Sequence, residues 1–580
     1  MQKAHTSRAH KPLVLAMAIA AIGLTACGGS DNKSSSDTGL KKVFNCTDSN
    51  VQGARVICIG SANDLSDQAV QDELIDALTE AQTGDTFVLP QGRYAFNATI
   101  SYSGQTDGLK VTDLTFRGAG MDKTIIDASG VSGDGFLIQY TDNLIFEDFA
   151  IYESNNNALK VIQSDGVIMR RMATVWETDY QSTNGAYGLY PVQTSNVLIE
   201  DCYVKGSADA GIYVGQSDKI VVRNNIAEKN VAGIEIENST EADVYGNTAR
   251  GNTGGILIFD LPIGSGKYGS GVRVFDNLVD ANNAPNFANV GTFAGGVHIV
   301  PPGTGVIVLS TSDVEIYNNT IKDHQTTSVA ITSYLLADET VAAAPNLNVG
   351  TEVTSYEDIH PHSKAIMDGW SPLVRNINIH NNSISLAAGL NNPQGDLIED
   401  LINGYNAFHN MQPDIASGKT TVPHILYDGV GELLANTPNP DGEGESILYA
   451  IAGGINQVAA AVKANIPGAP DYTPIDLDKF APYATDGGVC QSDNGIDGQN
   501  LFAASVYETS ATAGTFVDGS PLTKLEQLSG NLSLAGAIMA DPSGVMDCAS
   551  GYEGSPATVT FNAQTFGCTA DDSEKPSCAL

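Results

Sequence analysis

The chain is 580 residues long, 17 % of its residues are charged, and its formal net charge at pH 7 is −38. This length fits either several globular domains or one solenoid that grows by repetition. The negative charge argues against nucleic acid as a partner, because two polyanions repel each other. A neutral partner avoids this repulsion, and so does an acidic partner bridged by bound Ca²⁺; no other cofactor is predicted.

Residues 1–27 have the pattern of a signal peptide, with positive residues before an apolar run from Leu13 to Leu24. The run ends on L-T-A-C, which resembles the bacterial lipobox. That resemblance implies lipidation at Cys27, and Gly28, in place of an aspartate, favours the outer membrane, facing either the periplasm or the cell surface. The alternative is an ordinary signal peptide with a chance cysteine. Residues 28–44, rich in Gly, Ser and Asp, predict a flexible tether.

Eight cysteines include Cys27, and an exported chain folds where disulfides form. Proximity in the sequence suggests two pairs, Cys46 with Cys58 and Cys568 with Cys578, and the remaining Cys490 and Cys548 would form the third. Cys202 falls on an inward-facing position of the repeat described below. We therefore predict that it is a buried, unpaired thiol.

Residues 45–105 predict an N-terminal cap and the first strands. Asp67 to Ala81 has helical periodicity, with its apolar side chains on one side. A G-D-T-F-V-L-P-Q-G-R-Y stretch begins at Gly84 and predicts a strand and a turn. A helix followed by such a stretch resembles the start of right-handed parallel β-helix proteins, where an amphipathic helix covers the open end of the core.

Residues 106–385 carry a repeat. Cys202, Asn225 and Asn247 occupy equivalent positions, 23 and 22 residues apart. A period of this length indicates one supersecondary unit stacked on the next. Each unit has three short strands, and a glycine usually precedes the first. First strands are predicted at 136–138, 159–161, 189–191, 212–214, 234–236, 256–258, 297–299 and 329–331.

The pattern resembles the right-handed β-helix repeat superfamily, which includes pectate-lyase-like and alginate-epimerase-like enzymes, and it matches no specific enzyme family. The predicted fold is all-β, a right-handed parallel β-helix with three strands per rung. Residues 386–580 predict a mixed C-terminal region, with helices at Leu397–His409 and Ile447–Ala464, a strand within Pro423–Gly429 and a last rung within Gly487–Tyr507. This region either caps the open end or lies along the side of the β-helix.

Two columns of the repeat are predicted to be scaffold. A side-chain amide at the bend after the second strand donates and accepts between rungs, which accounts for the asparagine column. The outward column of the second strands pairs opposite charges and then aromatic rings, both of which stabilise a sheet. Its members are Glu147, Arg170, Glu200, Arg223, Tyr245, Phe275, Tyr317 and His380.

Insertions are the places where loops rise from the scaffold, and loops on a rigid scaffold often carry function. Each predicted insertion lies just before or just after a first strand, so the loops flank the first-strand face. They are expected at Val175–Tyr187, Leu261–Gly271, Asn282–Gly295, Val300–Ser312 and Leu335–Arg375.

The outward row of that face supplies the candidate catalytic residues Lys160, Tyr190, Tyr213, Glu235 and His298. Polysaccharide lyases and C5-epimerases need a base, an acid and a cation that neutralises the substrate carboxylate, and these side chains suit those roles. The alternatives are a mixed solvent-exposed face and aromatic rings that only stack on sugars. No metal site is predicted, because the histidine pair of the 358–362 loop lacks further ligands at a recognisable spacing.

The sequence therefore predicts an exported, lipid-anchored β-helix protein that binds a cell-envelope or environmental polysaccharide and modifies it as a lyase or an epimerase. The alternative is a non-catalytic structural lipoprotein of the outer membrane that docks a partner protein.

Overall fold

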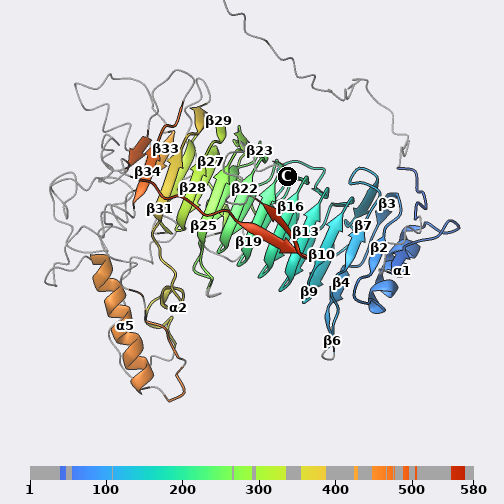
Figure 1. Ribbon diagram of the computed structural model, residues 1–580, viewed down its shortest axis with the longest axis horizontal. Coiled ribbons are helices and arrows are strands. Elements are labelled where there is room, and N and C mark those ends of the chain that lie inside the picture. Colours follow the sequence, from blue (N-terminus) through green and yellow to red (C-terminus); the bar gives the residue numbers. More distant parts are fainter. Residues whose placement is uncertain are drawn as a thin grey trace, which may run out of the picture. The chain divides into compact units, whose positions relative to one another are not determined.

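The computed structural model describes residues 40–46, 55–106, 109–263, 267–289, 296–334, 355–386, 424–428, 447–465, 467–469, 471–474, 476, 488–495, 503–505, 546 and 550–567. These residues belong to one compact unit that begins at Leu40. Within it, short parallel strands stack in chain order, from the blue N-terminal end to the orange strands (Figure 1). The predicted signal peptide, most of the tether, the helix at 397–409 and three cysteines (548, 568 and 578) lie outside the described residues.

Three parallel sheets form the walls of the solenoid, and successive strands of each rung belong to different sheets. The first sheet consists of β4 (Ile100–Ser103), β9 (Phe136–Gln139), β12 (Leu159–Ile162), β15 (Leu189–Val192), β18 (Ala210–Gly215), β21 (Ala232–Glu237), β24 (Gly254–Phe259), β27 (Thr304–Leu309), β30 (Thr327–Thr332), β33 (Ile425–Tyr427) and β35 (Ala503–Ser505).

The second sheet has the same parallel order and lies next in the chain. It consists of β1 (Val56–Cys58), β2 (Thr86–Val88), β7 (Thr115–Arg117), β10 (Leu144–Glu147), β13 (Asp165–Arg170), β16 (Ser195–Glu200), β19 (Asp218–Arg223), β22 (Thr240–Tyr245), β25 (Ser270–Phe275), β28 (Ser312–Tyr317), β31 (Arg375–His380) and β34 (Val489–Ser492).

The third sheet completes each rung. It consists of β3 (Gly92–Ala95), β8 (Thr124–Asp127), β11 (Ala150–Tyr152), β14 (Ala173–Val175), β17 (Tyr203–Lys205), β20 (Ile226–Glu228), β23 (Thr248–Arg250), β26 (Leu278–Asp280), β29 (Thr320–His324) and β32 (Ser383–Leu386). Two antiparallel hairpins stand apart from these sheets: β5 (Gln105–Thr106) with β6 (Leu109–Lys110), and β36 (Thr558–Phe561) with β37 (Gln564–Gly567).

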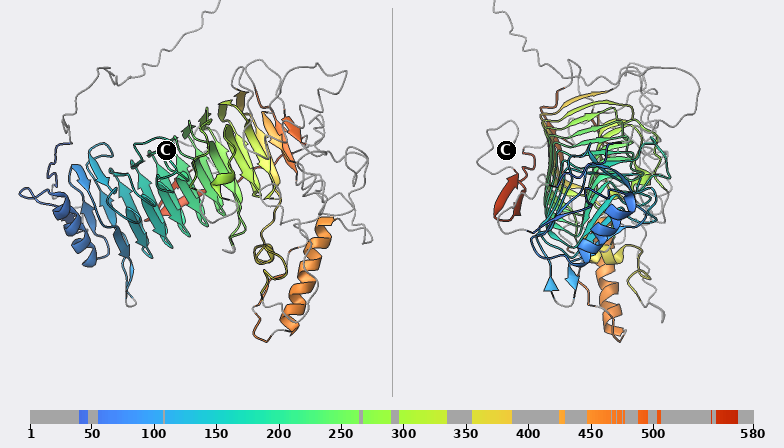
Figure 2. Two further views of the ribbon diagram at one scale, coloured as in Figure 1. Left: turned by 180° about the vertical axis from the view of Figure 1, so that it is seen from behind. Right: turned by 90° about the vertical axis from the view of Figure 1, so that its right-hand side faces the viewer.

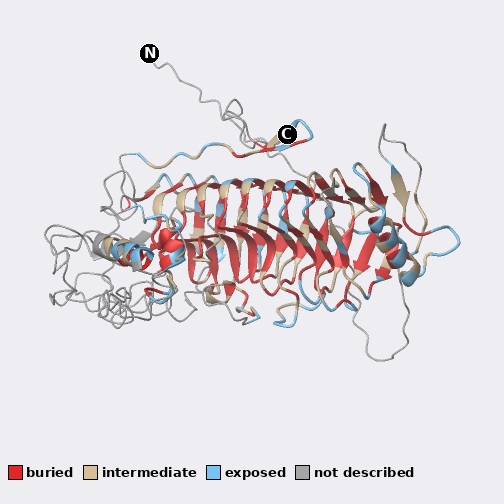
Figure 3. Cartoon of the chain, turned by 90° about the horizontal axis from the view of Figure 1, so that it is seen from below, coloured by how far each residue is buried: buried red, intermediate tan, exposed pale blue. Residues whose placement is uncertain are grey.

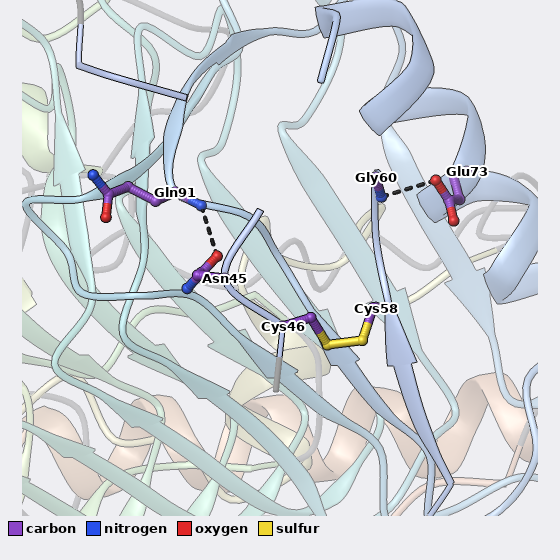
Figure 4. The surroundings of a disulfide bond; sticks show 6 residues. All are labelled: Asn45, Cys46, Cys58, Gly60, Glu73 and Gln91. Atoms are coloured by element: carbon purple, nitrogen blue, oxygen red, sulfur yellow. Dashed lines mark hydrogen bonds between the residues drawn. A yellow bond between two sulfur atoms is a disulfide. The ribbon is translucent and has the colours of Figure 1, made fainter. Parts of the chain in front are cut away.

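Helix α1 (Asp67–Thr79) covers the start of the apolar core, as predicted. The Ser66 side chain accepts a hydrogen bond from the backbone of Ala69 and caps the helix. Beside the helix, the Cys46–Cys58 disulfide joins the segment 40–46 to β1, and the Asn45 side chain accepts from the Gln91 backbone at 3.0 Å (Figure 4). The predicted Cys46–Cys58 pair is therefore confirmed. Cys490 is also disulfide-bonded, and Cys548, its predicted partner, lies outside the described residues.

The core is a continuous column of apolar side chains enclosed by the three sheets. Figure 3 colours most residues of the strands around it as buried. Alternation along β19 places Ile220 and Val222 inside with no exposed surface, and the neighbouring second-sheet strands repeat this. Cys202 is also buried in this core, where the loss of water raises the pKa of its thiol to about 12. The predicted unpaired, inward thiol is confirmed.

A ladder of asparagines runs along the corner between the second and third sheets, as predicted. The side-chain oxygen of Asn247 accepts from the backbone and side-chain amides of Asn225, at 2.9 and 3.0 Å. Its side-chain amide donates to the Val222 carbonyl at 2.9 Å and to Asn277 at 3.0 Å. The same contacts continue through Asn319 to Asn382, so the buried backbone of each corner is paired.

A second ladder, which the sequence analysis did not identify, runs along the next corner, before the first sheet. It links Asn230, Asn252 and Asn282, and ends on the buried ring of His324. This ladder explains the glycines before three of the first strands, Gly211, Gly233 and Gly255. A Cβ at Gly211 would lie 2.7 Å from the Asn230 amide nitrogen, which is closer than packing allows.

The second-sheet outward column has the predicted register. Arg223 pairs with Glu200 at 2.7 Å, and the rings of Tyr245 and Phe275 stack with centroids 4.8 Å apart. The C-terminal hairpin β36–β37 lies across this face, where Val559 packs in a cluster with apolar outward residues of β13, β16 and β19 (Figure 1).

The C-terminal region both extends the solenoid and covers its sides. β33 and β35 continue the first sheet and β34 continues the second, which confirms the predicted strand and last rung. Helix α5 (Ile447–Asn465) confirms the second predicted helix, and Figure 2 shows it beyond the edge of the sheets. No helix in the described part of the chain is long and apolar enough to cross a membrane.

One predicted strand is wrong. Val297–Ile299 forms a short 3-10 helix, η1, and the first-sheet strand of this rung is β27, which begins at Thr304. The predicted insertion at Val300–Ser312 is therefore also wrong, because most of it is strand. One long insertion, 281–303, precedes β27 instead. The other insertions flank the first sheet as expected.

We expect Asn247→Ala to lower the free energy of unfolding by roughly 2–4 kcal/mol, because it leaves the Asn225 N–H and the Val222 carbonyl buried without partners. Chemical denaturation measures this effect. Asn156→Ala is the control, since this exposed amide donates only to the side chain of Asp134. Equal losses for the two variants would contradict a structural role for the ladder.

Candidate functional site

The outward side chains of the first sheet change from polar to apolar along the solenoid. In register it runs Leu137, Lys160, Tyr190, Tyr213, Glu235, Leu257, Ile307, Ala330 and Leu426. Lys160 and Tyr190 are half-buried, whereas Tyr213 and Glu235 are only 3 % and 1 % exposed. The polar part of the row therefore passes from partial exposure to complete burial within four rungs.

The apolar part of the row lies under a second hydrophobic cluster outside the sheet. Leu257, Ile307 and Ala330 are buried there against side chains of α2 (Ser363–Met367), α5 and η1. Tyr213 belongs to the same cluster, and the half-buried residues Ile162, Tyr187 and Tyr190 pack against it, so the cover begins at the rungs of these residues.

Where the cover begins, three tyrosines and three carboxyl groups gather. We call this set the tyrosine–carboxyl cluster; its members are Tyr187, Tyr190, Tyr213, Asp209, Glu235 and Glu237. The rings of Tyr187, Tyr190 and Tyr213 pack with centroids 4.3–4.9 Å apart. The Lys160 ammonium lies 4.7 Å from the centre of the Tyr190 ring, a cation–π contact at the more open end.

The carboxyl groups come from neighbouring rungs. Asp209 directly precedes β18, while Glu235 and Glu237 both point outward from β21. The Tyr213 hydroxyl donates to Glu237 at 2.9 Å, and the Tyr187 hydroxyl faces Asp209 as a donor. Buried oxygens of Asp209 and Glu235 have no hydrogen-bond partner. Such atoms are costly to bury and are often completed by a ligand.

Loss of water strongly favours the protonated forms of these groups. It raises the pKa of Asp209 to about 8 and that of Glu237 to about 7, although the tyrosine hydrogen bonds oppose both shifts. Burial and the two neighbouring carboxyls raise the pKa of Glu235 well above its usual value. The cluster therefore holds carboxyls that gain and lose protons near neutral pH, as general acids and bases do.

The structure brings together four of the five predicted residues, Lys160, Tyr190, Tyr213 and Glu235. The predicted place of His298 is wrong, because it lies in η1, where its carbonyl accepts from Asn286 at 3.2 Å, and Ile307 takes its place in the row. The strand of this rung, β27, begins only after the 23-residue insertion 281–303, so the spacing of the earlier repeats does not predict its position.

Three members of the tyrosine–carboxyl cluster, Tyr187, Asp209 and Glu237, were not predicted from the sequence. Glu237 was detectable, because the alternation that turns Glu235 outward also turns outward the residue two positions later. Asp209 lies in a turn and Tyr187 in an insertion, so no strand period locates them. In the described part of the chain, no group of three or more His, Cys, Asp and Glu residues is arranged to hold a metal ion.

A family model described as a right-handed beta helix region matches residues 99–261 and 134–321. The predicted right-handed parallel β-helix is thereby confirmed, and no specific enzyme family is matched. No curated protein matches the chain.

Solved structures with similarity to the chain include the A-module of the Azotobacter vinelandii mannuronan C-5 epimerase AlgE4, with 18 % identity, 58 % of this chain and 87 % of that chain covered, and a TM-score of 0.32. A DFA-IIIase from Arthrobacter chlorophenolicus A6 has 11 % identity, coverages of 57 % and 85 %, and a TM-score of 0.32. A GH87 alpha-1,3-glucanase from Streptomyces thermodiastaticus has 14 % identity, coverages of 48 % and 61 %, and a TM-score of 0.26. Similarity at this level says nothing about the activity of this chain.

The raised pKa values of the carboxyls in the tyrosine–carboxyl cluster make the free energy of unfolding depend on pH. Carboxyls whose pKa is higher in the folded than in the unfolded state stabilise the fold fully below about pH 4, and this contribution is lost as the pH rises through about 7 to 8. We expect the thermal midpoint to fall by roughly 2–6 °C between about pH 5 and about pH 9.

Scanning calorimetry over this pH range measures the effect. The double variant Glu235→Gln/Glu237→Gln should flatten the profile, because an amide does not ionise. Glu241→Gln, at an exposed position one strand further on, is the control. A wild-type profile with the same slope as the double variant would show that the cluster does not titrate in this range.

Proposed function

We propose that the chain binds a polysaccharide on the outer face of the first sheet and modifies it at the tyrosine–carboxyl cluster. The observation that carries this proposal is the joint placement of three tyrosine rings and three carboxyls at the boundary of the apolar cover. Aromatic walls with a few convergent polar groups are typical of small-molecule and glycan sites. Loops that rise on both edges of this face support the same placement.

The reaction on the bound sugar is acid–base chemistry. Glu235 and Asp209 have buried oxygens without partners, and we propose them as the groups that contact the sugar. Tyr190 offers a ring face beside them, and Lys160 is the cation at the open end. Lyase and epimerase reactions use a base, an acid and such a cation, in agreement with the sequence-based expectation.

The proposed location is the outer membrane of the cell envelope. Its support is the sequence of residues 1–27, which resembles a lipoprotein signal, and the Gly/Ser-rich segment that follows. A lipid anchor at Cys27, followed by such a tether, would hold the β-helix near the membrane surface.

Tyr190→Ala should weaken polysaccharide binding by roughly 5- to 100-fold, because a half-buried ring face and its stacking energy are lost. A glycan array followed by calorimetry on the best ligand measures this. Tyr152→Ala, on the outward side of the third sheet, is the matched control and should bind as the wild type does. Equal weakening by both changes, or no binding to any glycan, would favour a protein-docking function instead.

Cys27→Ser should abolish lipid attachment, because only a thiol accepts the lipid in this type of signal. Metabolic labelling with palmitate and fractionation of the membranes measure the result. Expected is a labelled wild type in the outer membrane and an unlabelled variant. A wild type that is exported but carries no label would identify an ordinary signal peptide.

A further inference from the structure

The last described part of the chain runs back along the outer face of the second sheet. We call Met546 and residues 550–567 the C-terminal strap, and its hairpin, β36–β37, is the red element across β13, β16 and β19 in Figure 1. At the last rung, the backbone amide of Gln491 in β34 donates to the Met546 carbonyl at 2.9 Å. One rung earlier, the Asn378 side chain in β31 donates to the Tyr552 carbonyl at 2.9 Å.

The middle of the strap lies on three charged side chains of the second sheet. The Gly554 N–H donates to Glu315 of β28 at 3.0 Å, and the Ala557 N–H donates to Asp243 of β22. Between them is Arg273 of β25, which forms an ion pair with Asp243. A Cβ at Gly554 would lie 2.6 Å from the Arg273 Cγ, which is closer than packing allows, so the strap backbone rests directly on this side chain.

The end of the strap lies on an apolar part of the same sheet. Val559 and Phe561 are buried there, and the Thr560 N–H donates to the Asn196 side chain in β16 at 2.9 Å. The outward side chains beneath are Ile168, Leu198 and Val221. The strap therefore matches the sheet along its length, with backbone polar groups over the polar residues and apolar side chains over the apolar ones.

These contacts bridge rungs that do not otherwise touch. β13 and β34 are seven rungs apart in the second sheet, which is roughly 34 Å at about 4.8 Å per rung. In a solenoid each repeat contacts only its neighbours, so a rung near the free end can open alone. The strap adds contacts between residues that are 174 to 364 positions apart in the sequence. The opening of a covered rung therefore also breaks its contacts with the strap.

We propose that the C-terminal strap is a clamp that protects the rungs from β13 to β34 against local opening. The protected rungs include those of the tyrosine–carboxyl cluster, because β19 and β22 directly follow β18 and β21, which carry Tyr213 and Glu235. The strap thus holds these rungs closed from the second sheet, while the cluster lies on the first.

Hydrogen exchange of the full chain, measured by mass spectrometry, tests the clamp. Gly554→Val places a branched side chain where Arg273 leaves no room, and should release the strap. We expect the amides of β22, β25, β28 and β31 to exchange roughly 10- to 1000-fold faster, and those of β18 and β21 to follow them. β7 and β9, which precede the strap, should keep the wild-type rates. Ser555→Val is the matched control, since the same side chain enters at the next, exposed position.

Val559→Ser is a milder second variant, which decides the question if Gly554→Val does not fold. It removes a buried apolar side chain of the strap without adding volume, and should speed exchange in β13, β16 and β19 by roughly 5- to 50-fold. Thr560→Ser, at an exposed position, is its control. Faster exchange in the strap alone would overturn the inference, and so would equal acceleration in β7 and β9 or unchanged exchange throughout. No glycan enters this experiment, so its result is independent of the proposed function.

Discussion

The pairing of buried backbone groups at the corners of the solenoid is the constraint on which the rest of the structure depends. At each corner the chain leaves its ladder of strand hydrogen bonds, and no water reaches the N–H and carbonyl groups there. Asn225, Asn247 and Asn277 supply the missing partners and stack on each other, rung after rung. Because each amide bridges two rungs, the ladder also sets the register between them. This register aligns the side chains of every outward row, including the row that contains the tyrosine–carboxyl cluster.

The candidate site arises where two environments meet on one face of the scaffold. Toward the C-terminal end, α2, α5, η1 and Phe287 cover the first sheet with apolar side chains. Toward the N-terminal end, Lys160 keeps part of its surface exposed. Carboxyls at this boundary are shielded enough from water to be held in their protonated form. They are also close enough to the open rungs to contact a ligand. Neither a fully exposed row nor a fully covered one would combine these two properties.

A feature of this protein was predicted correctly from the sequence where its cause lies in nearby residues of the chain. The second-sheet rows, the first asparagine ladder and the buried thiol of Cys202 obey strand alternation and a fixed period, and the structure confirms them. The strand expected at Val297–Ile299 has a preceding glycine and three suitable residues, as true first strands do. Nothing local distinguishes it from β27, because the choice depends on which segment pairs with β24 across the insertion.

The same distinction separates what the sequence by itself determined from what only the tertiary structure decided. Periodicity determined the fold class, the phase of the repeat and the outward positions of Lys160, Tyr190, Tyr213 and Glu235, because a side chain's direction in a strand depends on its own chain alone. The tertiary structure decided that Tyr187 and Asp209 join them, that His298 does not, and that the face is covered from Tyr213 onward. These outcomes depend on how insertions and the distant helix α5 fold back onto the sheet, and no period in the sequence encodes such long-range packing.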